Sequence, residues 1–133
     1  MKVVDFNGNK YSWPPKGYEV NFDDIRPRSE LHLRCRELLR KLYPTQPILE
    51  EVPIPGENLF CDFYLPRRNM VIECNGEQHY TFMRHFHGTY TSFAKHKARD
   101  ERKLQWCNIN NIKFIVLPYN ENDEQWQKKI INE

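Results

Sequence analysis

The stretch NLFCDFYLPRRNMVIECNGEQHY, residues 58–80, decides both the fold and the candidate site of this chain. Two apolar runs, 58–65 and 70–75, flank a short turn that contains Pro66 and Asn69. Apolar runs of this length bounded by turn residues are typical of strands, and so short a turn predicts an antiparallel hairpin. Asp62 and Glu73 lie at similar distances from the turn, so the hairpin places them nearly opposite each other.

Two carboxylates that face each other on one hairpin create an electrostatic conflict. Ionised together and unpaired, Asp62 and Glu73 repel each other strongly in a low-dielectric site. A hard divalent cation resolves that conflict, because Mg²⁺ accepts a few carboxylate oxygens and keeps waters for a phosphate group. The hairpin therefore predicts a magnesium site, in which Mn²⁺ is the alternative ion.

The segments on either side of the hairpin complete an α/β layer protein. Ser29 is a good N-cap for a helix that has Glu30 in its first turn and ends before Pro44. The segment 80–91 has no clear period and is interpreted as a loop. The remaining predicted elements are an edge strand at 47–54, a long helix at 92–110, a strand at 112–119 and a short helix at 122–132. The order of helix, three strands, helix, strand and short C-terminal helix follows.

The totals fit one globular domain. A chain of 133 residues supports one hydrophobic core, and 39% hydrophobic with 29% charged residues is a globular composition. Residues 1–28 are predicted to be an N-terminal arm or a hairpin around Gly8, and residues 29–133 a single domain. The net charge of +2 does not by itself indicate a nucleic-acid partner. No apolar run is long enough to span a bilayer.

The four cysteines, Cys35, Cys61, Cys74 and Cys107, are widely spaced and form no CxxC pair. Structural zinc needs closely paired ligands, so a zinc site is not expected. A disulfide framework is not expected in a chain so rich in core residues. The prediction is four reduced and mostly buried thiols in a cytoplasmic protein.

Four segments carry a resemblance to a known family: SELHLRCRELL, FCDFYLP, VIECNGEQHY and KARDERKLQWCNINNIKFIVLPYNE. In combination they resemble the PD-(D/E)XK nuclease superfamily, and most of all the branch of very-short-patch-repair-type endonucleases with related phage and homing endonucleases. The resemblance covers roughly residues 29 to 120. It implies a restriction-endonuclease-like core of order αβββαβ, with 29–133 as a nuclease-like domain.

The resemblance also implies roles for particular residues. Asp62 matches the metal-binding acid of the central hairpin, and Glu73 matches the first acid of the (D/E)XK half. The carbonyl of Cys74 adds a backbone ligand, and Glu30 completes the metal site directly or through water. Gln78, His79 and Asp100 match the variant of the family in which a histidine and a later helical aspartate join the site. Taken alone, Glu30 is equally a helix-start charge and Asp100 an intrahelical ion-pair partner.

One position departs from the family pattern. The lysine of the motif falls at residue 75, where this chain has Asn75, and an amide supplies no positive charge. His79 as general base, Lys97 or Lys103 from the long helix, or a second metal ion are three ways to replace it. His79 is preferred because it follows the strand directly and Asp100 can orient its ring.

Basic residues flank the proposed site and alternate with aromatic ones. Cations beside aromatic rings suit phosphate contact and wedging between bases. A solvated charged helix beside a packed aromatic loop is the alternative explanation. The predicted nucleic-acid-binding residues are Arg67, Arg68, Arg84, His85, Lys95, Lys97 and Lys103.

These observations predict a magnesium-dependent DNA endonuclease that hydrolyses phosphodiester bonds. The alternatives are a catalytically inactive nucleic-acid-binding protein and a protein-interaction module on the same fold. The predicted partner is DNA, not a membrane, with a homodimer or a protein partner on the N-terminal arm also in view. The predicted location is the cytoplasm, which for a phage-encoded protein is that of the host cell.

Overall fold

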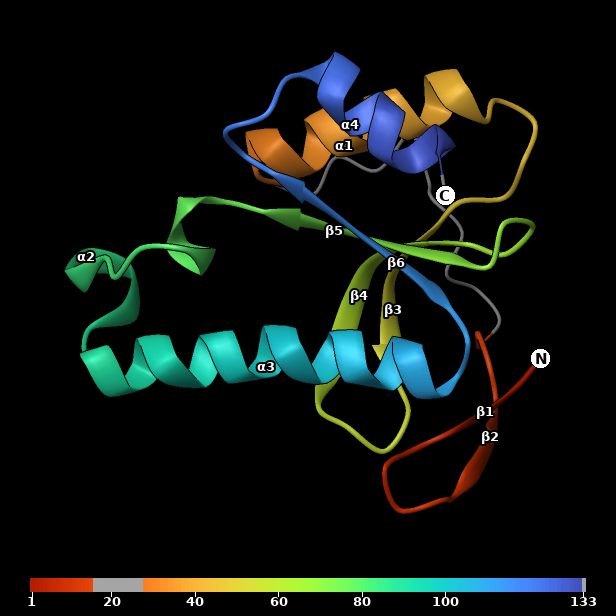
Figure 1. Cartoon of the computed structure of the whole chain (residues 1–133), viewed down its shortest axis with the longest axis horizontal. Helices are drawn as coiled ribbons and strands as arrows, with labels where there is room; N and C mark the ends of the chain where they lie inside the picture. Colours follow the sequence, from red (N-terminus) through yellow and green to blue (C-terminus); the bar gives the residue numbers. More distant parts are fainter. Residues whose placement is uncertain (16–27, 133) are drawn as a thin grey trace.

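A computed structural model describes residues 1–15 and 28–132 as a mixed α/β layer structure (Figure 1). A sheet lies between two helical layers, with α1 and α4 on one face and α3 on the other. The rest of the predicted N-terminal arm, residues 16–27, lies outside the described residues. Within the described part of the chain, no helix is both long enough and apolar enough to cross a membrane.

Four strands form the main sheet, in the spatial order β3-β4-β5-β6. They are β3 (Leu49–Ile54), β4 (Leu59–Leu65), β5 (Met70–Asn75) and β6 (Lys113–Pro118). The pairs β3/β4 and β4/β5 are antiparallel, while β5 and β6 are parallel because the connection between them crosses over through α3. The predicted hairpin at 66–69 is confirmed, with β3 at an edge as its prolines indicate.

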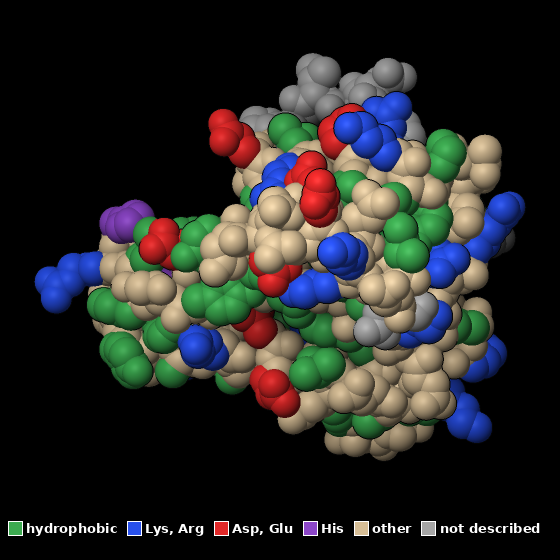
Figure 2. Space-filling model, turned by 45° about the horizontal axis from the view of Figure 1, so that its top comes forward, with side chains coloured by type: hydrophobic (Ala, Val, Ile, Leu, Met, Phe, Trp, Pro, Cys, Tyr) green, Lys and Arg blue, Asp and Glu red, His purple; other side chains and the backbone are tan. Residues whose placement is uncertain are grey.

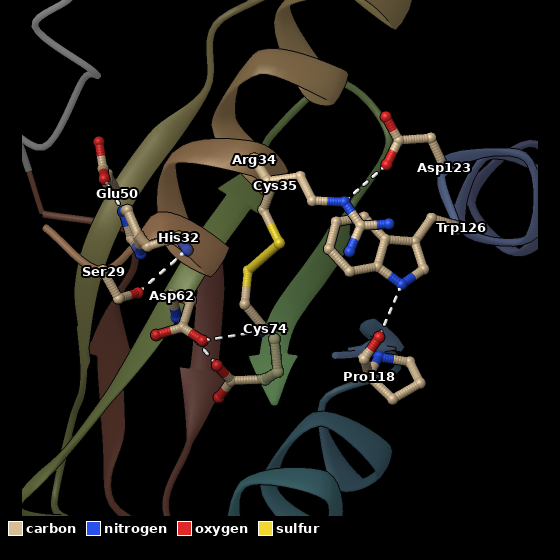
Figure 3. The surroundings of a disulfide bond; sticks show 11 residues. Ser29, His32, Arg34, Cys35, Glu50, Asp62, Cys74, Pro118, Asp123 and Trp126 are labelled. Carbon is tan, nitrogen blue, oxygen red and sulfur yellow. Dashed lines mark hydrogen bonds and ion pairs between the residues drawn. A yellow bond between two sulfur atoms is a disulfide. The ribbon is translucent and has the colours of Figure 1, made fainter. Parts of the chain in front are cut away.

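Two helices cover one face of the sheet. Helix α1 (Glu30–Leu42) begins at the predicted N-cap, where the Ser29 hydroxyl accepts a hydrogen bond from the backbone N–H of His32. Helix α4 (Asp123–Ile131) begins at Asn122 with a capping box. Arg34 joins the two helices, because its guanidinium lies 3.6 Å from the centre of the Trp126 ring and donates to Asp123 at 2.7 Å (Figure 3).

The opposite face is covered by α3 (Tyr90–Ile109) and by a small N-terminal hairpin of β1 (Lys2–Val4) and β2 (Lys10–Ser12). Trp13 and Trp106 are fully buried between these elements and the sheet, with ring centres 5.1 Å apart. The indole N–H of Trp13 donates to the carbonyl of Pro53 at 2.8 Å. The predicted N-terminal hairpin is confirmed.

The segment 80–91 is not the featureless loop that the sequence predicts. A 3₁₀ turn, η1 (Glu77–His79), follows β5, and a one-turn helix, α2 (Arg84–His87), precedes α3. The buried ring of His87 organises this segment, because its Nδ1 accepts from the N–H of Met83 and its Nε2 donates to the carbonyl of Gln78. One-turn elements held by such local contacts leave no hydrophobic period in the sequence.

The prediction of four reduced cysteines is wrong for two of them. Cys35 of α1 and Cys74 of β5 form a disulfide across 39 positions of sequence (Figure 3). Helix α1 crosses the end of β5 and brings the two Cα atoms to 6.8 Å, within the reach of such a bond. Sequence spacing contains no sign of that crossing. Cys61 and Cys107 are free and buried, as predicted.

Candidate active site at the divergence of β4 and β5

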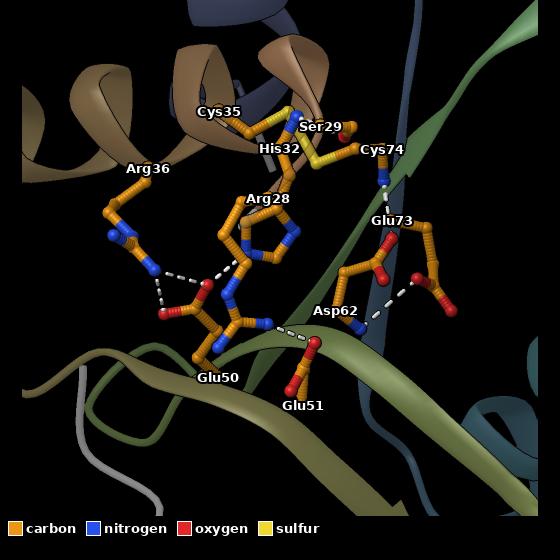
Figure 4. Close-up of polar contacts among 10 residues, drawn as sticks. All are labelled: Arg28, Ser29, His32, Cys35, Arg36, Glu50, Glu51, Asp62, Glu73 and Cys74. Carbon is orange, nitrogen blue, oxygen red and sulfur yellow. Dashed lines mark hydrogen bonds and ion pairs between the residues drawn. A yellow bond between two sulfur atoms is a disulfide. The ribbon is translucent and has the colours of Figure 1, made fainter. Parts of the chain in front are cut away.

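The site lies where the β4/β5 hairpin stops pairing. Phe63 and Ile72 are the last paired residues of the ladder, so Asp62 and Glu73 occupy the next opposed positions. Their side chains replace the missing backbone bonds: the Asp62 N–H donates to Glu73 Oε2 at 3.2 Å, and the Cys74 N–H donates to Asp62 Oδ2 at 2.9 Å (Figure 4). The prediction that these two acids face each other is confirmed.

A local reversal of the sheet accompanies this divergence. Asp62 stands in register with Glu51 of β3, whose φ of 53° lies in the left-handed region. On β4, Cys61 packs in the core beneath α3, whereas Phe63 packs in the core beneath α1. Strict alternation would place both on the same face, so the strand changes face at Asp62. This change leaves the Asp62 carboxylate beside the end of β5 rather than within either core.

Glu73 is the buried member of the pair, with 3% of its surface exposed. Burial and the neighbouring Asp62 carboxylate raise the pKa of Glu73 well above its ordinary value. The ammonium of Lys103, from α3, lies 2.9 Å from Glu73 Oε1 and opposes that shift only in part. Burial alone lowers the pKa of Lys103, but the ion pair with Glu73 outweighs it and the net pKa is raised. Lys103 therefore brings one positive charge to the two opposed acids.

His79 and Asp100 form a second polar pair beside the first. The ring Nδ1 of His79, at the end of η1, lies 2.8 Å from Asp100 Oδ2 of α3. Both side chains are partly exposed, at 25% and 31%. The predicted pairing of Asp100 with His79 is present in the structure.

A cavity of about 380 Å³ is lined by both members of the His79–Asp100 pair and by Glu73 and Lys103, whereas Asp62 is not among its lining residues. It lies between α3 and the strands β5 and β6. Figure 2 shows that acidic, basic and hydrophobic side chains are interspersed over the face of the molecule that it presents. Its lining residues are Glu73, Asn75, His79, Tyr80, Lys97, Asp100, Glu101, Lys103, Leu104, Phe114 and Val116.

Two further predicted site residues, Glu30 and Gln78, do not line the cavity. Glu30 is an exposed residue of the first turn of α1. Among residues 1–15 and 28–132, no three His, Cys, Asp or Glu side chains are grouped to hold a metal ion. The side chain of Gln78 folds back over Gly76, and the backbone carbonyl of Gln78 accepts a hydrogen bond from His87. Gln78 therefore supports η1 and does not line the cavity.

The predicted DNA-binding residues fall into three groups. Lys97 and Lys103 line the cavity. Arg84, His85 and Lys95 are exposed on α2 and the start of α3, which project beyond the sheet (Figure 1).

Arg67 and Arg68 do not flank the site. They lie in the β4/β5 turn at the start of β5, whereas the cavity lies at its end. At about 3.3 Å per residue, the strand separates the turn from Asn75 by roughly 20 Å. Arg68 lies over the Tyr43 ring instead, 5.1 Å from its centre.

Four residues that complete the cavity wall were not predicted as site residues: Glu101, Leu104, Phe114 and Val116. A signal for part of this wall exists in the sequence. Lys97, Asp100, Glu101 and Leu104 follow the i, i+3, i+4, i+7 spacing of one helical face. Phe114 and Val116 are alternate residues of β6 and share one face of that strand.

Comparison with known proteins finds two viral relatives. The chain is 42% identical over 66 residues to uncharacterized protein 307L of Invertebrate iridescent virus 6, covering 50% of this chain and 34% of that protein. It is 32% identical over 92 residues to uncharacterized protein 033L of Invertebrate iridescent virus 3, covering 65% and 47%. The chain thus spans less than half of either relative. No family model and no solved structure matches it.

Proposed function

We propose that this protein is a magnesium-dependent endonuclease that hydrolyses phosphodiester bonds of DNA, on a restriction-endonuclease-like core. The observation that carries the proposal is the pair of opposed acids, Asp62 and Glu73, held side by side where two strands diverge and joined by Lys103. The mixed sheet and its element order are consistent with it, and the two iridovirus relatives are consistent with a viral origin.

The donors present fit a hard divalent cation. Burial and the facing Asp62 carboxylate raise the pKa of Glu73 although Lys103 lies against it, so a further cation is favoured here, and oxygen donors are those that Mg²⁺ or Mn²⁺ prefers. Asp62, Glu73 and the carbonyl of Cys74 are the groups that would hold the ion, leaving other positions to water and phosphate oxygens. Bound there, the ion supplies a Lewis acid that neutralises charge on the phosphate.

The remaining side chains divide the other tasks. Lys103 supplies the positive charge that Asn75 lacks, and its ammonium already lies against the acid pair. His79 accepts the proton of the attacking water, while Asp100 holds the imidazole in place at 2.8 Å. Lys97 lines the same cavity and contributes charge for a phosphate group. The lysine of α3 and the histidine of η1 thus have separate roles, charge and proton transfer.

Cleavage of DNA in the presence of Mg²⁺ tests the proposal. We expect cleavage by the unaltered protein on at least one member of a panel of duplex, mismatched, branched and single-stranded DNA, read on a denaturing gel. Asp62→Asn and Glu73→Gln should each reduce the rate at least about a hundredfold. Glu77→Gln, at an exposed position next to the site, is the matched control and should retain activity.

Two results would replace the proposal. DNA binding without cleavage in Mg²⁺ and Mn²⁺, across the whole panel, would identify an inactive nucleic-acid-binding protein. Absence of metal binding together with absence of salt-sensitive DNA affinity would identify a protein-interaction module. Full activity in Asp62→Asn or Glu73→Gln would also end the assignment of the site.

A further inference from the structure

The cavity contains more apolar surface than cleavage chemistry requires. Leu104, Phe114 and Val116 form one wall of it, and all three remain partly exposed. They lie on the α3 side of β6, an edge strand that α3 does not fully cover. Water-exposed apolar surface inside a polar cavity is favourable only when a ligand covers it.

Polar groups surround this apolar wall on the side of β5 and η1. The side chains of Asn75 and Tyr80 both line the cavity. Glu101 lines it from the α3 side and is exposed. An amide, a phenol and a carboxylate beside an apolar wall match a ligand with flat apolar faces and a polar edge. A nucleobase has that chemistry.

The charges at the other end of the cavity match a phosphate attached to such a base. Lys97 and Lys103 bring two ammonium groups, and Lys103 adjoins the acid pair of the proposed cleavage site. The cavity is also lined by three acidic residues, Glu73, Asp100 and Glu101, which repel a phosphate. A phosphate is therefore favoured only beside the two lysines. A volume of about 380 Å³ is enough for a small ligand and too small for a stacked base pair with its backbone.

We propose that this cavity receives one unpaired nucleotide of a DNA strand, with its base against Leu104, Phe114 and Val116 and its phosphate toward Lys97 and Lys103. The inference rests on the proposed function for its partner, DNA, and specifies the substrate class. A paired base cannot enter without leaving its stack, which costs a few kcal/mol. DNA that already contains an unpaired nucleotide is therefore the preferred substrate over continuous duplex.

The test compares two hairpin DNAs that differ only in whether one 2-aminopurine is unpaired or paired. Binding is followed by fluorescence in EDTA, so that no cleavage interferes. We expect the unaltered protein to bind the unpaired form about tenfold more tightly, because one base gains a stacking surface. Equal affinity for the two hairpins overturns the proposal.

Cavity-filling variants localise the preference. Val116→Trp on β6 and Leu104→Phe on α3 should each abolish it, while Lys113→Trp, an exposed position at the start of β6, should preserve it. The thermal midpoint of each variant establishes that it is folded. Retention of the preference in a folded Val116→Trp or Leu104→Phe variant overturns the proposal. A free deoxynucleotide monophosphate that binds as tightly as the unpaired hairpin would overturn the assignment to a DNA strand.

The outcome is separable from that of the proposed function. Asp62→Asn should keep the preference for the unpaired hairpin while losing cleavage in Mg²⁺. Preference without cleavage in the unaltered protein contradicts the nuclease and supports the nucleotide cavity. Cleavage that is indifferent to unpaired nucleotides supports the nuclease and contradicts the cavity assignment.

Discussion

Glu50 and Glu73 are two buried glutamates of one sheet with opposite surroundings (Figure 4). Glu50 accepts two hydrogen bonds from the Arg36 guanidinium, at 2.8 and 2.9 Å, and is hydrogen-bonded to His32. Burial raises the pKa of Glu50, but these two partners outweigh it and the net pKa is lowered. Glu73 instead faces Asp62, and its pKa is raised despite Lys103.

The contrast separates a carboxylate whose charge the protein's own cations stabilise, Glu50, from one whose charge they stabilise only in part, Glu73. The cluster of Glu50, His32 and Arg36 joins α1 to β3 and is balanced within the protein. The pair of Asp62 and Glu73 is not, and its neighbours are the polar residues of a cavity. Buried charge of the second kind is favoured at sites of chemistry, where a substrate or ion completes the balance.

The largest effect should come from breaking the balanced cluster. Glu50→Gln removes the partner of Arg36 and His32 and leaves a buried guanidinium uncompensated. Loss of one partner of a buried ion pair costs about 3–5 kcal/mol of unfolding free energy. Urea denaturation measures it. A loss below about 1 kcal/mol would mean that the Glu50 cluster is not a structural unit.

The next largest effect should come from the disulfide that connects the two regions. Cys35 adjoins Arg36 in the chain, and Cys74 adjoins Glu73. Opening a loop of 39 positions costs about 4 kcal/mol in the chain-entropy account. Cys35→Ser should lower the unfolding free energy by about 2–4 kcal/mol under non-reducing conditions. Thiol titration of the unfolded, unreduced protein should find two free cysteines, and finding four would contradict the bond.

The pH dependence of stability should have opposite signs at the two glutamates. A raised pKa at Glu73 gives stability that is complete below the unfolded value of 4.5 and is lost as pH rises through the folded value. The stability of Glu73→Gln relative to the unaltered protein should therefore rise as the pH increases above 4.5.

At Glu50 the lowered pKa gives stability that is present above 4.5 and lost as pH falls through the folded value. The destabilisation caused by Glu50→Gln should therefore shrink in acid. The thermal midpoints of both variants, measured from about pH 3 to about pH 8 in steps of roughly half a pH unit, would check this. Parallel curves for the two variants would remove the distinction on which the comparison depends.

The smallest effect on stability, with a distinct effect on activity, is expected at the rim of the cavity. His79 and Asp100 are partly exposed, so their pairing is worth at most about 1 kcal/mol. Asp100→Asn should leave the denaturation midpoint nearly unchanged while reducing the cleavage rate at least about tenfold, because the imidazole loses its orienting partner. An unchanged rate would assign the pair to structure alone.

The opposed acids were predictable because a short turn fixes hairpin register. With Leu65 paired to Met70, the partner of Asp62 must be Glu73. The helix boundaries at Ser29 and Asn122 were predictable from local capping chemistry. These features depend on neighbouring residues alone.

The features that sequence reasoning left open or got wrong depend on how separate elements pack. Whether Lys97 or Lys103 reaches Glu73 is set by the rotation of α3, which the burial of Trp106 and Cys107 fixes. The Cys35–Cys74 bond depends on where α1 crosses β5. Placing Arg67 and Arg68 near the site was a geometric error, because the turn and the strand end are at opposite ends of β5.

The central claim is that Asp62 and Glu73 together hold one divalent cation. Calorimetric titration of Mn²⁺ into the protein at neutral pH tests it most directly, with Asp62→Asn as the site variant and Glu77→Gln as the matched control. We expect binding of one ion per chain in the unaltered protein and the control, and none in Asp62→Asn. Equal binding by Asp62→Asn, or no binding by the unaltered protein, would contradict it.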